Sequence, residues 1–129
     1  MSDSSSDSKS EELRRVRRAL GRLARRAPLT SRAFGDLHKA TQRAGALDVR
    51  TKELIALAIG VASKCEDCVV YHAADAKAAG ATDEQIVEAV EVAVMMGGGP
   101  ALLYASRVLE VLESAGTLAA AAPSRGKPP

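Results

Sequence analysis

The sequence has almost no aromatic residues and only two cysteines among its 129 residues. Phe34, Tyr71 and Tyr104 are the whole aromatic set, and tryptophan is absent. A core without large aromatics must be filled by alanine, leucine, valine and isoleucine, whose small side chains let helix axes approach one another. The composition therefore favours packed helices, and the length favours a single domain.

Long apolar runs are also missing, which bears on where the protein works. No stretch of eighteen apolar residues is present, so the sequence predicts no transmembrane helix. The opening segment, MSDSSSDSKSEE, lacks the apolar region of a secretory signal. We therefore expect a cytoplasmic protein, in which thiols stay reduced unless they cycle. This expectation weighs against a purely structural disulfide.

Charge is distributed unevenly along the chain. Residues 11–26 carry seven arginines against two glutamates, whereas residues 27–116 carry eight basic and twelve acidic residues. We favour the interpretation that the apolar stripe of this basic arm packs on a neighbouring helix or subunit. Membrane headgroups and nucleic acid are alternatives, but the arm has no aromatic to anchor or to stack on bases, and we expect no specific nucleic-acid partner.

The pattern of helix start and stop signals predicts about six helices and no strand. Residues 1–10 and 117–129 are predicted to be disordered tails, because they cannot bury enough apolar surface. The arm, 11–27, reads as an amphipathic helix that Pro28 ends. Residues 28–116 form the body, so the predicted fold is all-α, a single-domain helical bundle.

The first two helices of the body have different characters. Thr30 or Ser31 can cap the first, which runs to Gly45. Its inward residues are expected to be Phe34, Leu37 and Thr41. Asp48 can cap the second, VRTKELIALAIGVASK, whose apolar residues lie on nearly all sides. A helix of this kind is expected to be buried.

The later helices have clearer boundaries. A helix that starts near Cys65 ends at Gly80, a residue suited to the left-handed position after a helix. Thr82 and Gln85 match a capping box for the following helix. The GGGP segment breaks that helix, and Pro100 suits the first turn of the last one.

Both cysteines and one of the two histidines fall within eight residues, CEDCVVYH. On a helix, Cys65, Cys68 and His72 share one stripe, so the sulfurs can bridge and the histidine can reach the second sulfur. Unpaired N–H groups at a helix start lower a thiol pKa, whereas the charges of Glu66 and Asp67 oppose a thiolate. The helix dipole favours Cys65 as the attacking sulfur and the histidine favours Cys68, so the spacing leaves both open.

Glu53 lies in the helix that is expected to be buried. A buried carboxylate needs a partner or is partly neutral, and a raised pKa suits a general base or proton acceptor. The alternative places Glu53 in an exposed first turn, where the helix dipole favours an acidic residue.

The spacing E-x11-C-x2-C-x3-H relates the four candidate residues, Glu53, Cys65, Cys68 and His72. This spacing resembles the signature of the alkylhydroperoxidase D-like branch of the carboxymuconolactone decarboxylase superfamily. The flanking segments KELIALAIGVASKCEDCVVYHAADAKAAGATDEQIVEAV and MMGGGPALLYA resemble the same family, and the resemblance covers about residues 28–113. It implies an all-helical homo-oligomer, a trimer or a hexamer, and a basic arm that is dispensable for the chemistry.

The resemblance also implies a role for each residue. Cys68 attacks a hydroperoxide and becomes a sulfenic acid, and Cys65 resolves it as a disulfide. His72 and Glu53 relay the proton through water. The implied activity is that of an antioxidant peroxidase or disulfide oxidoreductase with a lipoamide- or thioredoxin-like dithiol reductant. Asp67 stands where active peroxidases of the branch often have histidine, a departure that bears on the peroxide rate.

Other readings of these residues lead to different functions. The decarboxylase branch lacks the cysteine pair, so lactone decarboxylation is not implied. Zinc could use Cys65, Cys68, His72 and His38, but structural zinc sites gather ligands from two short pairs and His38 stands alone in FGDLHKA. We therefore expect no metal and no cofactor. The alternative function is a non-enzymatic redox sensor or assembly component, whose dithiol switches the state of the basic arm.

Overall fold

The structure is a computed structural model that describes residues 11–121, and this range contains six α-helices and no strand. The helices are α2 (Glu11–Arg26), α3 (Pro28–Gln42), α4 (Val49–Ala62), α5 (Glu66–Ala78), α6 (Asp83–Gly97) and α7 (Gly99–Ser114). The prediction of an all-α fold is confirmed. The predicted tail at 1–10, and residues 122–129 of the tail predicted at 117–129, lie outside the described residues. Within the described range, no helix is long and apolar enough to span a bilayer.

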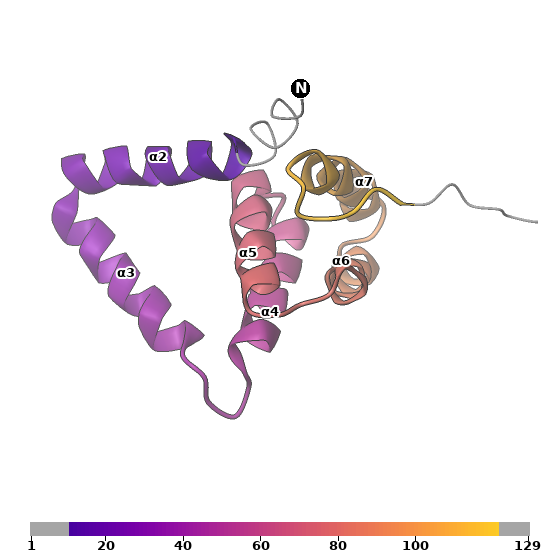
Figure 1. The fold of residues 1–129 in the computed structure, drawn as a ribbon, viewed down its shortest axis with the longest axis horizontal. Coiled ribbons are helices and arrows are strands. Elements are labelled where there is room, and N and C mark those ends of the chain that lie inside the picture. Colours follow the sequence, from indigo (N-terminus) through magenta and orange to yellow (C-terminus); the bar gives the residue numbers. More distant parts are fainter. Residues whose placement is uncertain (1–10, 122–129) are drawn as a thin grey trace, which may run out of the picture.

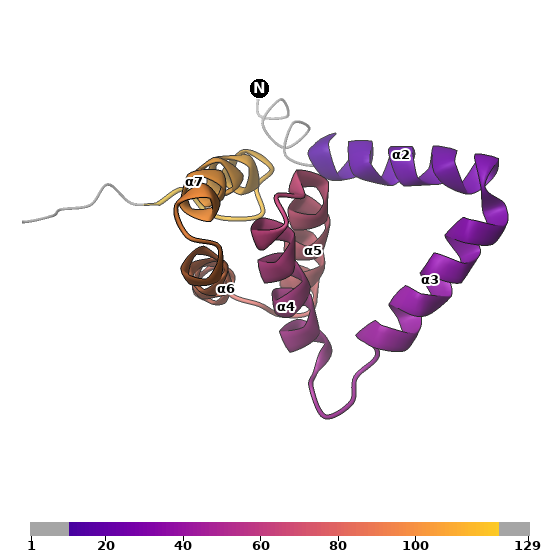
Figure 2. The same cartoon turned by 180° about the vertical axis from the view of Figure 1, so that it is seen from behind.

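Helices α4 and α5 form a central hairpin (Figure 1). Helices α6 and α7 pack on one side of this pair, and α2 and α3 form a V on the other, as the view from behind also shows (Figure 2). The core lies between the hairpin and the α6–α7 pair. Its largest fully buried side chains are Leu57, Val61, Val69, Ile86, Val108 and Leu112. The core thus fixes the relative positions of α4 and α5, which carry the candidate residues.

Several predicted helix boundaries are confirmed. The Asp48 carboxylate accepts a hydrogen bond from the Thr51 N–H at 2.7 Å and caps α4. Thr82 and Gln85 form the reciprocal bonds of a capping box at the start of α6. Gly80 follows α5 with a φ of +97°, a left-handed conformation that glycine adopts without steric cost.

The predicted start of α3 is wrong. Pro28 opens α3 instead of only ending α2, Ala27 occupies the N-cap without a side-chain cap, and Thr30 and Ser31 lie inside the helix. Proline suits a first turn because its missing N–H would have no partner there and its φ is already helical. The helix ends at Gln42, short of the predicted end.

Two apolar surfaces predicted to be inward are open in the single chain. Phe34 and Leu37 of α3 are 67% and 56% exposed, and Thr41 is exposed too. Ile55 and Ile59 of α4 are 45% and 60% exposed, so this helix is covered on only part of its circumference. A sequence pattern marks a face as apolar, but it does not say whether the same chain or a second copy covers that face.

The ordered body extends past the predicted boundary at residue 116. Leu118 is buried in the core at 5% exposure, and the Ala119 N–H donates to Asp83 at 3.1 Å. The start of the segment predicted to be a disordered tail is therefore held against α6.

Candidate dithiol site

The turn between α4 and α5 positions the two cysteines. Lys64 adopts a left-handed conformation with a φ of 56°, which reverses the chain at the end of α4. The Cys65 N–H then donates to the carbonyl of Gly60 at 2.9 Å, and α5 begins at Glu66. Cys65 is therefore the N-cap of α5, and Cys68 lies in its first turn.

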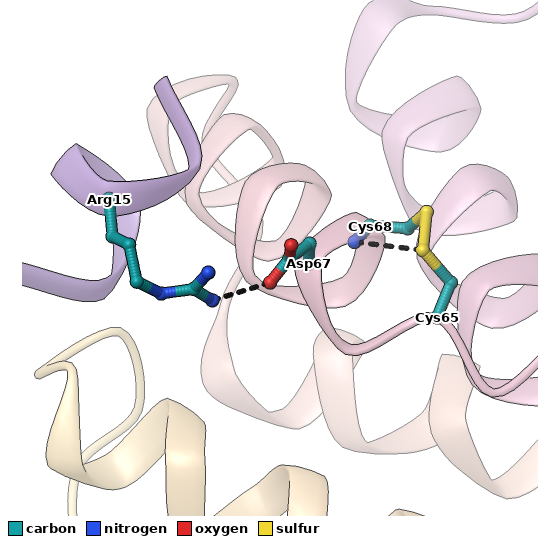
Figure 3. The surroundings of a disulfide bond; sticks show 4 residues. All are labelled: Arg15, Cys65, Asp67 and Cys68. Carbon is teal, nitrogen blue, oxygen red and sulfur yellow. Dashed lines mark hydrogen bonds and ion pairs between the residues drawn. A yellow bond between two sulfur atoms is a disulfide. The ribbon is translucent and has the colours of Figure 1, made fainter. Parts of the chain in front are cut away.

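Cys65 and Cys68 form a disulfide at the start of α5, with their Cα atoms 5.2 Å apart (Figure 3). The backbone N–H of Cys68 donates to Sγ of Cys65 at 3.2 Å. This bond takes the place of the hydroxyl or carboxylate cap of an ordinary helix start. The predicted proximity of the two sulfurs is thus seen in the structure, and one backbone donor of the helix start points at Cys65 rather than at Cys68.

Close packing at Gly60 holds α5 against α4 beside the disulfide. A Cβ atom at this position would lie 3.3 Å from Cβ of Cys68 and 3.3 Å from Cγ2 of Val69. Any larger residue would therefore push the first turn of α5 outward, and the second sulfur with it. Gly60 sets the distance between the dithiol and α4.

Buried Glu53 of α4 pairs with partly buried His72 of α5. Glu53 is only 3% exposed, so the alternative of an exposed first turn is wrong. Its Oε2 lies 2.7 Å from Nδ1 of His72, which is the partner that a buried carboxylate requires. Because Nδ1 is engaged by Glu53, Nε2 is the ring nitrogen left to exchange a proton with water or a thiol.

His38 of α3 joins this pair, although the sequence analysis set it aside as a histidine that stands alone. The ligand atoms of His38, Glu53 and His72 all lie within 4.8 Å of one another. The rings of His38 and His72 are stacked with centroids 6.2 Å apart, and Tyr71 lies edge-on to both. His38 comes from a different helix at no regular spacing from the motif, so no local sequence signal could have placed it here.

Further acidic and aromatic groups surround the pair. Burial raises the pKa of the Asp75 carboxyl, and the charge of Glu53 raises it further while His72 opposes the rise. Burial also raises the pKa of Tyr71, with a smaller contribution from Asp75. The side of α5 that follows the dithiol is therefore a partly desolvated site with several titratable groups.

The basic arm reaches the motif through Arg15. Its guanidinium donates to Oδ1 of Asp67 at 2.6 Å, and both side chains are about half exposed (Figure 3). Hydrogen bonds to Asp67 and then to Glu12 raise the pKa of the Arg15 guanidinium. The negative charge that lies between the cysteines in the sequence is thus paired with a positive charge in the structure.

The Tyr104 hydroxyl is buried without a hydrogen-bond partner among the described residues, and its ring packs against the core. Burial raises the pKa of this phenol.

The zinc alternative needs Cys65 and Cys68 as thiolate ligands. Both sulfurs are in the disulfide, so the structure does not hold them in that form.

Residues 28–111 match the carboxymuconolactone decarboxylase family. The chain belongs to this family. Its fold is similar to that of a family member from Legionella pneumophila, with 38% identity, a TM-score of 0.75 and coverage of 84% of this chain and 96% of the other.

Two further relatives share the same region. A family protein from Thermotoga maritima, for which a part in an antioxidative response has been suggested, is 36% identical with a TM-score of 0.68, covering 77% of this chain and 85% of the other. An uncharacterised protein of the cox locus of Paracoccus denitrificans is 42% identical over 95 residues, which are 74% of this chain and 86% of the relative. The family match begins at the first residue of α3, so α2 lies outside it.

Proposed function

We propose that this family member is a thiol-dependent antioxidant oxidoreductase of the alkylhydroperoxidase D-like branch, which reduces hydroperoxides through Cys65 and Cys68. The observation that carries the proposal is the placement of the disulfide at the start of α5, one helical turn before a histidine that is paired with a buried glutamate. The role suggested for the Thermotoga maritima relative supports the same chemistry.

The reaction uses the dithiol as a two-electron donor. The Cys68 thiol passes its proton through His72 and water towards Glu53, and the thiolate attacks the terminal oxygen of the hydroperoxide. The O–O bond breaks, the alcohol leaves with a proton, and Cys68 becomes a sulfenic acid. The Cys65 thiol then attacks the sulfenic sulfur and releases water, which forms the disulfide. An external dithiol reduces the disulfide and closes the cycle.

One local feature favours Cys68 as the sulfur that attacks the peroxide, and a second feature bears on how the disulfide is reduced. Cys68 and His72 are four residues apart on α5, so they lie on the same face of the helix. Sγ of Cys65 already accepts the Cys68 N–H, which stabilises charge on Cys65. A stabilised thiolate is the better leaving group, so the reductant is expected to attack the sulfur of Cys68 and release Cys65.

A consumption assay tests this function. The reduced protein is mixed with an alkyl hydroperoxide and with dihydrolipoamide, thioredoxin or glutathione as donor, and peroxide loss is followed over many turnovers. Wild-type protein is expected to turn over with a dithiol donor, and the Cys68→Ser protein is expected to be inactive. Stoichiometric oxidation without turnover, with every donor, would contradict the enzymatic function.

That last outcome would favour the second candidate, a redox sensor whose dithiol switches the basic arm. The contact between Arg15 of α2 and Asp67 within the motif supports it, because this ion pair links the arm to the segment between the cysteines. Proteolysis of the arm in the reduced and oxidised states separates the two functions, since only a sensor requires the cleavage rate to depend on the disulfide.

A further inference from the structure

Three different helices bring potential metal ligands together beside the dithiol. His38 comes from α3, Glu53 from α4 and His72 from α5, and their ligand atoms all lie within 4.8 Å of one another. Glu53 is buried, and the two histidines are partly buried. Two imidazoles and one carboxylate are the protein ligands of many zinc sites that keep an open fourth position.

The state of His38 points to a ligand that is not another side chain. Its Nε2 atom is buried and has no hydrogen-bond partner among residues 11–121. Buried polar nitrogens almost always have a partner. An unpaired ring nitrogen beside a carboxylate therefore favours a bound ligand as its partner. The Glu53–His72 bond accounts for two of the three groups, and the third, His38, has a ligand atom within 4.8 Å of theirs.

We propose that His38, Glu53 and His72 bind a divalent transition-metal ion of the Zn²⁺ type. Tetrahedral coordination at Zn–N distances of about 2.0–2.1 Å puts ligand atoms about 3.3 Å apart. Atoms that are now at most 4.8 Å apart reach this spacing by small side-chain rotations, without movement of the helices. Both sulfurs are in the disulfide, so the ligand set in this oxidised state contains no thiolate.

The ion would act as a regulator of the dithiol. It takes the lone pair of His72 and the carboxylate of Glu53, which are the groups that accept the Cys68 proton in the proposed reaction. A metal-loaded protein therefore lacks a free proton acceptor beside Cys68, and a thiolate that does form can bind the open position of the ion instead of attacking peroxide, so the protein reacts slowly with peroxide. This second half of the inference rests on the proposed function, whereas metal binding by itself does not.

Binding is tested in a full-length protein in which both cysteines are replaced, Cys65→Ser/Cys68→Ser, so that no thiol can hold the metal. Zn²⁺ is titrated by calorimetry, and Co²⁺ is titrated as a coloured probe whose visible absorption reports tetrahedral coordination. We expect one ion per chain. Adding His38→Ala in this background should weaken binding by about a hundredfold or more, since even indirect partners of a metal ligand are typically worth 10–100-fold.

Two further variants guard against a folding artefact. His38→Gln keeps a side chain of similar reach, and it is expected to lose the Co²⁺ absorption while retaining the helical circular dichroism. Lys39→Ala, at the next and exposed position of α3, is the matched control and should bind as the parent does. Absence of binding by the parent at micromolar Zn²⁺, or equal binding by the His38 variants, overturns the metal site.

Regulation is tested separately with intact cysteines. The rate of peroxide consumption is measured with and without Zn²⁺, with a thiol reductant that does not remove Zn²⁺ from the protein. The ratio of the two rates is then compared between wild type and His38→Ala. We expect Zn²⁺ to slow wild type at least tenfold and to leave the ratio near one in the variant, whatever the variant's own rate. If Zn²⁺ binds but does not slow wild type, the regulatory half is wrong. If no protein consumes peroxide, the proposed function fails while the binding result stands.

Discussion

Oε2 of Glu53 and Nδ1 of His72 lie 2.7 Å apart, although nineteen residues separate them in the chain. Glu53 is one turn into α4 and His72 is in the middle of α5, so the packing of the central hairpin alone brings them together. In the proposed reaction this pair accepts the proton of the Cys68 thiol, and this role can be measured.

Glu53→Gln and His72→Ala should each slow the first oxidation of the protein without abolishing the disulfide. Both changes lower the thiolate fraction but leave the geometry of the two sulfurs unchanged. General acid–base groups of this kind typically contribute about a hundredfold or more. Single-turnover mixing with hydroperoxide measures the step, and a rate within twofold of wild type in both variants would remove the relay from the mechanism.

Cys68→Ser and Cys65→Ser should fail in different ways. Cys68→Ser removes the nucleophile, so one equivalent of hydroperoxide should leave Cys65 reduced. Cys65→Ser should react once, after which the sulfenic acid on Cys68 persists or over-oxidises because no resolving thiol remains. Mass spectrometry with a sulfenic-acid trap reads both outcomes. A trapped Cys65 in the first variant, with no reaction in the second, would reverse the roles.

The ion pair between Arg15 and Asp67 should tune the thiols weakly. Arg15→Gln leaves the Asp67 charge unpaired beside the sulfurs, so the thiol pKa should rise and alkylation near neutral pH should slow. The effect should stay within about threefold, because an exposed pair is screened by water and salt. In an Asp67→Asn background the same arginine change should have no such effect. An equal fall in the alkylation rate in both backgrounds would mean that the arm acts through its packing on α5 and not through the ion pair.

Asp83 should make stability depend on pH at the acid end. The hydrogen bond from Lys77 and then the Ala119 N–H hold the pKa of this carboxyl below its usual value of 3.8. The stability that it contributes is therefore complete above about pH 4 and is lost as the pH falls through the lower pKa of the folded state.

The Asp83→Asn protein should accordingly melt below wild type at pH 7, and the difference should shrink as the pH falls below 3.8 and through the lower pKa of the folded state. Thermal unfolding followed by circular dichroism measures it. Glu88→Gln, at an exposed position of the same helix, is the control. A difference in melting temperature that stays constant over the whole pH range would contradict the assignment.

The open apolar surfaces should be covered by further copies of the chain. Phe34 and Ile59 are 67% and 60% exposed in the single chain, and a protein rarely leaves so many large apolar side chains in water. We expect a trimer or a hexamer by light scattering at about micromolar concentration. Phe34→Asp and Ile59→Asp should each lower the mass, whereas Glu88→Ser should not. A monomeric wild type would show that these faces are not subunit contacts.

The sequence determined the features that depend on neighbours within one helical turn. The caps at Asp48 and Thr82, the left-handed Gly80 and the proximity of Cys65 and Cys68 all follow from the geometry of a single helix end. Each involves residues at most four apart, and helix geometry fixes such distances whatever the rest of the chain does. Helix start and stop signals of the same local kind predicted the all-α fold.

Only the tertiary structure decided which helices meet. It buried Glu53 against His72, brought His38 of α3 to the same point and set Arg15 of α2 against Asp67. It also left Phe34 exposed on a face that the sequence marks as inward. These outcomes depend on the angles at which helices pack, which follow from how the whole set of core side chains interlocks. The sequence shows which residues are apolar or ionisable. The residues that they contact lie on other helices, and only the packing of those helices determines them.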